Sequence, residues 1–321
     1  MLKGKPALVI DVTYRCNATC GYCQWGAPGA RGREITDNLR VPAGTLSALG
    51  IKRVVFSGGE PLLRGDLEKI AAYYREAGIN SVVVISNGLR LFPNRLKSLL
   101  GAGVTGVSAS LDGVTPDVAH ASRGMTGTQH EKIMRNIEAA LEFRWQMQRP
   151  FEFVVNTVLS KANLKLEHMA ALVDFCNRHS ADWLKFNPVF DDGYLGANAP
   201  WLNFSRDDAK LIRELGEIVT ARAAIKTNPP WFWNTVADVV GGEKRLKGGS
   251  CGLDKGQVLL ARGELKFCAW IKTPVYGRAT ETISAEQSRL AIAKFRRARA
   301  SCRTGAWCFC LQDIGHRWEV E

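Results

Sequence analysis

Short apolar runs alternate with longer amphipathic stretches over the first two thirds of the chain. The apolar runs have the length of buried strands and are Ala7–Thr13, Arg53–Ser57, Ser81–Ser86, Gly106–Leu111, Phe151–Val158 and Trp183–Val189. The stretches between them carry apolar residues at helical spacing, most clearly Asp66–Ala77, Asn94–Ala102, Thr128–Gln148, Leu164–His179 and Arg206–Ala223. Repeated strand–helix units form parallel strands with right-handed crossovers. The sequence therefore predicts an α/β fold, a partial (βα)6 TIM-type barrel with its chemistry at the C-terminal edge of the strands.

This alternation stops after about residue 224. The segment that follows begins with Pro229–Pro230 and Trp231–Trp233, and it contains glycine pairs at 241–242 and 248–249. We therefore expect two domains, a barrel over residues 1–224 and a small cysteine-rich domain over residues 225–321.

Composition argues against several classes of protein. The apolar stretch Ala7–Ile10 is far too short to span a bilayer or to act as an export signal, so we expect a cytoplasmic protein with no membrane partner. The formal net charge of +12 permits an anionic partner. The densest basic run, Lys294–Arg299, has no interleaved aromatic residues and is interpreted as the solvated face of a helix, which makes a nucleic-acid partner unlikely.

The chain has nine cysteines, which in a reducing compartment favour metal binding or catalysis over disulfides. Three lie close together near the N-terminus. Cys176 lies on an apolar helical stretch and is interpreted as a small buried hydrophobic residue. The other five lie in the last quarter of the chain, so the sequence predicts two metal sites.

The N-terminal cysteines Cys16, Cys20 and Cys23 directly follow the first predicted strand. Three thiolates can bind three irons of a four-iron cluster and leave the fourth iron open to a chelating ligand. A zinc site would need a fourth ligand nearby, and the nearest histidine is His120.

A second motif, Phe56-Ser57-Gly58-Gly59-Glu60-Pro61, ends the second predicted strand. Together with the three-cysteine loop it resembles the radical S-adenosylmethionine (SAM) superfamily, over about residues 7–224. The resemblance implies that SAM and a [4Fe–4S] cluster are cofactors. It also implies that Gly58 and Gly59 let the backbone approach SAM, and that Glu60 accepts a hydrogen bond from its ammonium group.

The same resemblance extends to the third and fourth strands. Ser86 and Asn87 match the element that reaches the ribose of SAM, and Ser110 and Asp112 match the element near its methionine part. Arg123 matches an arginine that pairs with the carboxylate, for which a guanidinium fork is well suited.

Three further positions match the family less specifically. Asn156 and Asn187 lie where the family places ribose and adenine contacts, and Tyr22 lies where an aromatic side chain covers the adenine.

The C-terminal cysteines resemble an auxiliary-cluster domain of the SPASM or twitch type. They are Cys251, Cys268, Cys302, Cys308 and Cys310, and a hairpin is predicted at Val258–Ala261 and Glu264–Phe267. Four of the five suffice for one auxiliary [4Fe–4S] cluster, with a structural zinc site as the alternative. Either Cys251 and Cys268 are both ligands and the spare thiol is one of the last three, or Cys251 is the free, catalytic thiol.

The resemblance implies a radical enzyme that removes a hydrogen atom from a small-molecule substrate after reduction by a flavodoxin- or ferredoxin-type donor. Similar proteins include epimerases and dehydrogenases that modify aminoglycosides and aminocyclitols in antibiotic biosynthesis. A spare thiol favours epimerisation with a cysteine hydrogen-atom donor. Dehydrogenation with the auxiliary cluster as electron acceptor, peptide modification and nucleic-acid modification remain the alternatives.

Overall fold

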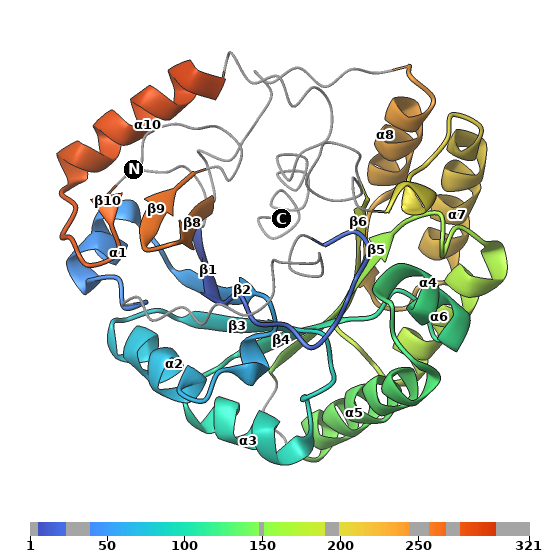
Figure 1. Ribbon diagram of the computed structural model, residues 1–321, viewed down its shortest axis with the longest axis horizontal. Coiled ribbons are helices and arrows are strands. Elements are labelled where there is room, and N and C mark those ends of the chain that lie inside the picture. Colours follow the sequence, from blue (N-terminus) through green and yellow to red (C-terminus); the bar gives the residue numbers. More distant parts are fainter. Residues whose placement is uncertain are drawn as a thin grey trace.

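The computed structural model describes residues 6–23, 39–147, 151–189, 199–243, 257–267 and 277–299. One sheet contains all ten strands of these ranges (Figure 1). The strands are β1 (Ala7–Thr13), β2 (Arg53–Gly58), β3 (Ser81–Ser86), β4 (Gly106–Ser110), β5 (Glu152–Leu159), β6 (Trp183–Pro188), β7 (Lys226–Thr227), β8 (Gln257–Ala261), β9 (Glu264–Lys266) and β10 (Gly277–Arg278).

The strand order is β10-β9-β8-β1-β2-β3-β4-β5-β6-β7, and every pair from β8 to β7 is parallel. The ends of this sheet do not meet among the described strands, so the barrel is partial, as the sequence predicts. Because β1 to β6 are parallel, their C-terminal ends lie at one edge of the sheet.

The helices are α1 (Ala43–Leu49), α2 (Leu67–Glu76), α3 (Pro93–Gly101), α4 (Pro116–Arg123), α5 (Gly127–Gln146), α6 (Leu166–Arg178), α7 (Asp208–Arg222), α8 (Pro230–Val240) and α10 (Ala285–Arg299). The five helices predicted from the sequence correspond to α2, α3, α5, α6 and α7, and the six predicted strands correspond to β1–β6. Helices α1, α4 and α8 were not predicted. No helix in the described part of the chain is long and apolar enough to cross a membrane.

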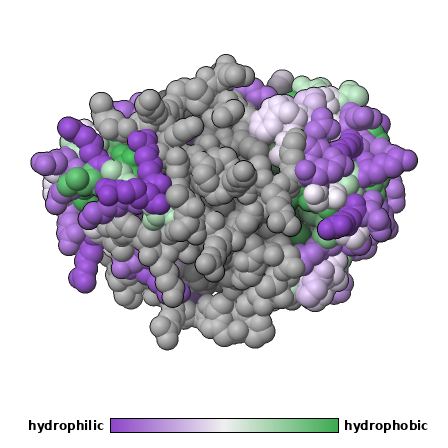
Figure 2. All heavy atoms as spheres, turned by 90° about the horizontal axis from the view of Figure 1, so that it is seen from above, coloured by the Kyte–Doolittle hydropathy of each residue, from purple (hydrophilic) through white to green (hydrophobic). Residues whose placement is uncertain are grey.

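The sheet curves, and its helices lie along the outer, convex side (Figure 1). Alternate strand residues such as Ile10, Val54 and Phe56 are fully buried in the core on this side. The strand residues between these core residues point to the other side of the sheet and are half-buried. We call the surface that they form the concave face. In the view from above, the described surface at both sides of the molecule is mostly hydrophilic with small apolar spots (Figure 2).

Residues beyond 224 extend the sheet at both ends. β7 pairs with β6, and the hairpin of β8 and β9 pairs through β8 with β1. Helix α8 packs on α7, where the ring of Trp233 lies directly against Gly216. A Cβ on Gly216 would lie only 2.3 Å from the Cγ of Trp233. The predicted hairpin is confirmed, whereas the domain boundary at residue 224 stays a prediction.

The end of β1 interlocks with the Gly-Gly turn that follows β2. The backbone N–H of Gly59 donates to the carbonyl of Thr13 at 2.7 Å, and that of Glu60 donates to the carbonyl of Arg15 at 2.8 Å. A Cβ on Gly58 would lie 2.3 Å from the oxygen of Thr13, and one on Gly59 would lie 2.1 Å from the oxygen of Arg15. Both glycines are therefore required by the close approach of the chain that leads into Cys16.

We predict that Gly59→Ala destabilises the fold, because its methyl group meets backbone atoms that cannot rotate away. Overpacking of this kind costs about 1–3 kcal/mol. Gly65→Ala is the matched control, since a Cβ at that exposed glycine meets nothing within 4 Å. Thermal unfolding checks the prediction, and equal melting temperatures for the two variants would contradict it.

Candidate functional site

The three N-terminal cysteines lie on the cysteine loop, which we define as residues 14–23, directly after β1. Cys16, Cys20 and Cys23 are half-buried and form no disulfide. In the described ranges, no three His, Cys, Asp or Glu side chains converge closely enough to hold one metal ion. A four-iron cluster makes a different demand, because each thiolate binds its own iron atom.

Burial opposes the ionisation of two thiols of this loop, and the charge of Arg123 favours it. Burial raises the pKa of Cys16, and it raises the pKa of Cys20 from 9.0 to about 12. Metal coordination deprotonates such thiols outright. The three cysteines therefore fit the ligand set of an iron–sulfur cluster: they are half-buried sulfur donors at the sheet edge, and bound iron would favour their ionised form.

The start of the cysteine loop is anchored by Asn87, which follows β3. Its side-chain amide donates to the Asn17 side-chain oxygen at 2.8 Å and lies 3.9 Å from the Sγ of Cys16. The side-chain oxygen of Asn87 accepts the backbone N–H of Leu89. Asn87 therefore holds the loop, and its predicted contact with the ribose stays a prediction.

Glu60 is fully buried and joins the ends of β2 and β3. Its carboxylate accepts the backbone N–H of Leu62 at 3.0 Å, the hydroxyl of Ser86 at 2.9 Å and the backbone N–H of Asn87 at 2.7 Å. Burial raises the pKa of Glu60, and these hydrogen bonds oppose the rise. The carboxylate therefore has a positioning task inside the chain, and its predicted contact with an ammonium group is untested.

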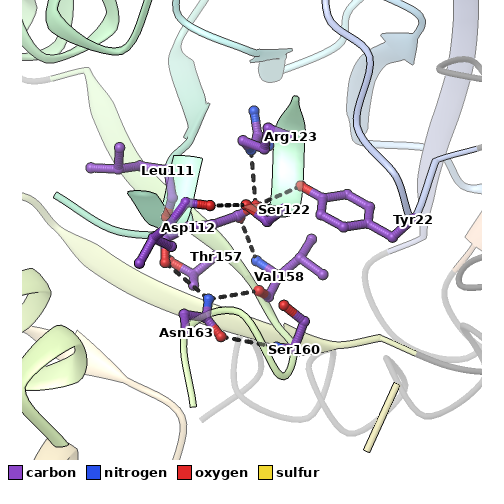
Figure 3. A network of polar contacts seen from close by, with 10 residues as sticks. Tyr22, Leu111, Asp112, Ser122, Arg123, Thr157, Val158, Ser160 and Asn163 are labelled. Atoms are coloured by element: carbon purple, nitrogen blue, oxygen red, sulfur yellow. Dashed lines mark hydrogen bonds and ion pairs between the residues drawn. The ribbon is translucent and has the colours of Figure 1, made fainter. Parts of the chain in front are cut away.

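The end of the cysteine loop is anchored by Asp112, which follows β4 (Figure 3). One carboxylate oxygen accepts the hydroxyl of Tyr22 at 2.8 Å and the Nε of Arg123 at 3.0 Å. The other accepts the backbone N–H of Val158 on β5 at 2.9 Å. Burial raises the pKa of Tyr22, so its phenol stays neutral and acts as a donor.

Helix α4 contacts the same loop through its C-terminal end. The backbone N–H of Gly21 donates to the carbonyl of Ser122 at 3.1 Å. Gly124 ends the helix with a φ of 59°, and a Cβ there would lie 2.4 Å from the Oγ1 of Thr19. The helix that carries Arg123 is thus fixed to the loop that carries the cysteines.

Arg123 is buried beside this loop, and its guanidinium is only partly used. Its Nε is engaged by Asp112, whereas its Nη1 is buried and has no hydrogen-bond partner among the described residues. A buried donor left without a partner costs about 1–3 kcal/mol. An unsatisfied guanidinium nitrogen at this position fits a ligand carboxylate, as the sequence predicts for SAM.

The remaining predicted cofactor residues lie on neighbouring strands. Asn187 on β6 donates to the side-chain oxygen of Asn156 on β5 at 2.6 Å, so these two side chains form a pair. Ser110 is buried at the end of β4. Their contacts with the ribose, the adenine and the methionine part stay predictions, as does the stacking of Tyr22 on adenine. The C-terminal cysteines, Cys251, Cys268, Cys302, Cys308 and Cys310, lie outside the described residues.

Sequence reasoning missed one candidate, Asp11. It lies on the concave face of β1, between Ile10 and Val12, which are fully buried on the opposite side, and it pairs with Ser57 on β2. Burial raises the pKa of Asp11 from 3.8 to about 7, and the guanidinium of Arg262 opposes the rise. A lone carboxylate within an apolar strand is the signal that could have identified it.

Asp11→Asn should stabilise the protein more at pH 8 than at pH 5. The pKa of Asp11 is higher in the folded protein than its ordinary value of 3.8, so the stability linked to this carboxyl is lost as the pH rises from about 4 to about 7. Asn cannot ionise and escapes this loss. Melting temperatures of both proteins at the two pH values test this, and an equal difference at both would show that Asp11 does not titrate as described.

Sequence similarity to known proteins extends over about half of this chain. Residues 10–158 match the family model of the Radical SAM superfamily. The AdoMet-dependent heme synthase of Methanosarcina barkeri is 32% identical over 157 residues, 48% of this chain and 43% of that protein. The PqqA peptide cyclase of Rhodopseudomonas palustris is 31% identical over 162 residues, 50% of this chain and 41% of that protein. The chain thus spans less than half the length of these relatives.

Among solved structures, anSMEcpe with bound AdoMet and Cp18Cys peptide superposes with a TM-score of 0.60 at 15% identity. The match covers 98% of this chain and 96% of that one, which supports the fold. The matched segment, residues 10–158, runs from β1 to β5 and contains the cysteine loop, the Gly-Gly turn and Arg123. Residues 10–158 of this chain therefore match the radical SAM superfamily, a family whose cofactors are SAM and a [4Fe–4S] cluster.

Proposed function

We propose that this protein is a radical SAM enzyme that removes a hydrogen atom from a carbon of a small polar substrate. The observation that carries the proposal is the position of Arg123, whose unsatisfied Nη1 is buried beside the loop that carries Cys16, Cys20 and Cys23. SAM bound to a cluster needs two kinds of protein group: a cation that pairs with its carboxylate, and thiolates that hold the iron.

The chain's own residues have separate tasks in this proposal. Cys16, Cys20 and Cys23 hold the cluster, Arg123 binds the SAM carboxylate, and Asn87 keeps the loop at the sheet edge. When bound, the cluster supplies the electron that splits SAM into methionine and a 5′-deoxyadenosyl radical, which abstracts the hydrogen atom. The surrounding residues orient the substrate and exclude water.

Replacing Cys16, Cys20 and Cys23 together with Ala is expected to abolish formation of 5′-deoxyadenosine. About four irons per chain should remain, because the proposed auxiliary site is left intact. Iron analysis and chromatography of the quenched reaction measure both quantities. Cys176→Ala is the matched control, since this buried thiol lies in α6 away from the loop. Continued 5′-deoxyadenosine formation by the triple variant would refute the proposal.

The concave face supports a polar substrate. Asp11, Ser57, Ser108, Asn156 and Lys185 occupy half-buried positions on it, among apolar neighbours. A carbohydrate-like substrate of the aminoglycoside type offers the hydroxyl and ammonium groups that such a surface can bind. The expected reaction is epimerisation, with a cysteine that returns a hydrogen atom from the opposite side.

Two alternatives remain within the same chemistry. Dehydrogenation would need an auxiliary [4Fe–4S] cluster at the C-terminal cysteines as electron acceptor. Peptide modification draws support from the name of one relative, the PqqA peptide cyclase. Either reaction would use a flavodoxin- or ferredoxin-type donor, and neither calls for nucleic acid or a membrane.

Turnover of an aminoglycoside in deuterium oxide distinguishes epimerisation from dehydrogenation. A donor thiol such as Cys251 exchanges with solvent, so the inverted carbon should gain one deuterium. The thiyl radical left behind takes one electron from the reductant and one proton from solvent. Mass spectrometry reads the product, and one that has lost two hydrogens and gained no deuterium would contradict inversion.

Cys251→Ala tests which thiol is the donor. If Cys251 is the free thiol, the variant should keep its iron and still form 5′-deoxyadenosine, but it should no longer invert the substrate. Loss of iron in this variant would instead assign Cys251 to the auxiliary cluster.

A further inference from the structure

The carboxylate of Asp112 connects two parts of the site that are distant in sequence. Its Oδ2 accepts both the hydroxyl of Tyr22 at 2.8 Å and the Nε of Arg123 at 3.0 Å (Figure 3). The side chain of Asp112 is completely buried, and that of Arg123 is 7% exposed. Because one oxygen atom serves both donors, a shift of either donor changes the position of the other.

Asp112 is also hydrogen-bonded to the residues at and after the end of β5. Its Oδ1 accepts the backbone N–H of Val158, and its backbone carbonyl accepts the side-chain amide of Asn163 at 2.9 Å. Asn163 also donates to the carbonyl of Val158 at 2.9 Å. One carboxylate oxygen and the backbone carbonyl of Asp112 are thus tied to neighbouring residues, and the other oxygen, Oδ2, is the link between Tyr22 and Arg123.

Tyr22 transmits this position to the cluster ligands. It lies between Cys20 and Cys23, and its side chain is 5% exposed and packs against Ala199 and Leu202. The neighbouring Gly21 donates to the carbonyl of Ser122, the residue before Arg123. In the described ranges the cysteine loop is also joined to the Arg123 region by the hydroxyl of Thr19, which donates to the carbonyl of Gly124 at 3.4 Å. The hydroxyl of Tyr22 differs from these two contacts because it reaches Arg123 through another side chain, that of Asp112.

We propose that Asp112 is a positioning residue that couples carboxylate binding at Arg123 to the order of the cysteine loop through the hydroxyl of Tyr22. The proposal rests on the proposed function, in which Arg123 binds the SAM carboxylate. A carboxylate bound to the Nη1 of Arg123 restricts the guanidinium. The guanidinium then restricts the Asp112 carboxylate, and that carboxylate restricts the hydroxyl of Tyr22. The coupling is reciprocal: if SAM binding orders the loop, then an ordered loop raises the affinity for SAM by the same free energy. The hydroxyl of Tyr22 then has a task separate from any stacking of its ring.

The test uses Tyr22→Phe in the iron-reconstituted protein, with SAM as the probe. The variant removes the hydroxyl and keeps the ring. SAM should slow hydrogen–deuterium exchange of the amides in residues 16–23 of the unchanged protein, and much less so in the variant. Its affinity for SAM should fall roughly tenfold, as expected for a hydrogen bond to a charged group.

Tyr74→Phe is the matched control. Tyr74 is also a buried tyrosine, and its hydroxyl donates to the backbone carbonyl of Leu39 instead of to Asp112. The control should bind SAM with unchanged affinity and show the normal slowing of exchange. If Tyr22→Phe loses its iron while Tyr74→Phe keeps it, the hydroxyl holds the ligands even without SAM, and the proposed coupling is overturned.

A double-mutant cycle separates coupling from a general loss of stability. Arg123→Ala and Tyr22→Phe should be non-additive in SAM affinity, because each removes the same connection. Additive effects, or full SAM-dependent slowing of exchange in Tyr22→Phe, would overturn the coupling. If Arg123→Ala alone leaves SAM affinity unchanged, the proposed carboxylate site fails, an outcome distinct from additivity between two active variants.

Discussion

Two buried carboxylates hold the cysteine loop, one at each end. Glu60 orders the end of β3, from which Asn87 reaches Asn17, and Asp112 binds Tyr22 directly. A buried carboxylate is costly unless its oxygens are well satisfied. Asp112 forms an ion pair with Arg123, whereas Glu60 accepts hydrogen bonds from three uncharged donors. Burial raises the pKa of Glu60, and these hydrogen bonds and the charge of Arg123 oppose the rise. Since both carboxylates follow strand ends, the register of the parallel sheet determines where the cysteines lie.

The strands could be predicted from the sequence because their helix-covered face is apolar, so each strand is a short, mainly apolar run even where a polar side chain such as Asp11 faces the concave side. The missed helices have identifiable reasons. Helices α1 and α4 have only seven and eight residues, so their apolar periodicity is too short to detect. Helix α8 begins at Pro230, and the proline pair indicated a break; proline at the first helical position is, however, favourable.

The positions of the site residues could be predicted, but their partners could not. Glu60 bonds to Ser86 and Asn87, which are 26 and 27 residues away, and Tyr22 bonds to Asp112, 90 residues away. A motif gives the residue type at a strand end, while the rotamer depends on which neighbour offers a donor. The glycines illustrate the same point: Gly58 and Gly59 make room for the backbone of Thr13 and Arg15, a contact that the motif does not indicate. Their predicted approach to SAM stays a prediction.

The register of β1 ties the concave face to the cysteine loop. A slip of one residue would turn Asp11 into the helix-covered core and bring Ile10 or Val12 to the concave side, so that a carboxylate would be buried among apolar side chains. The contact between Gly59 and Thr13 opposes such a slip, because it fits only one alignment of the two strand ends. The ion pair of Arg53 and Glu152, at 3.2 Å, occupies the opposite edge, where β2 and β5 begin. The register of β1 therefore determines both where the cysteine loop begins and which β1 side chains face the concave side. A change of register would alter both.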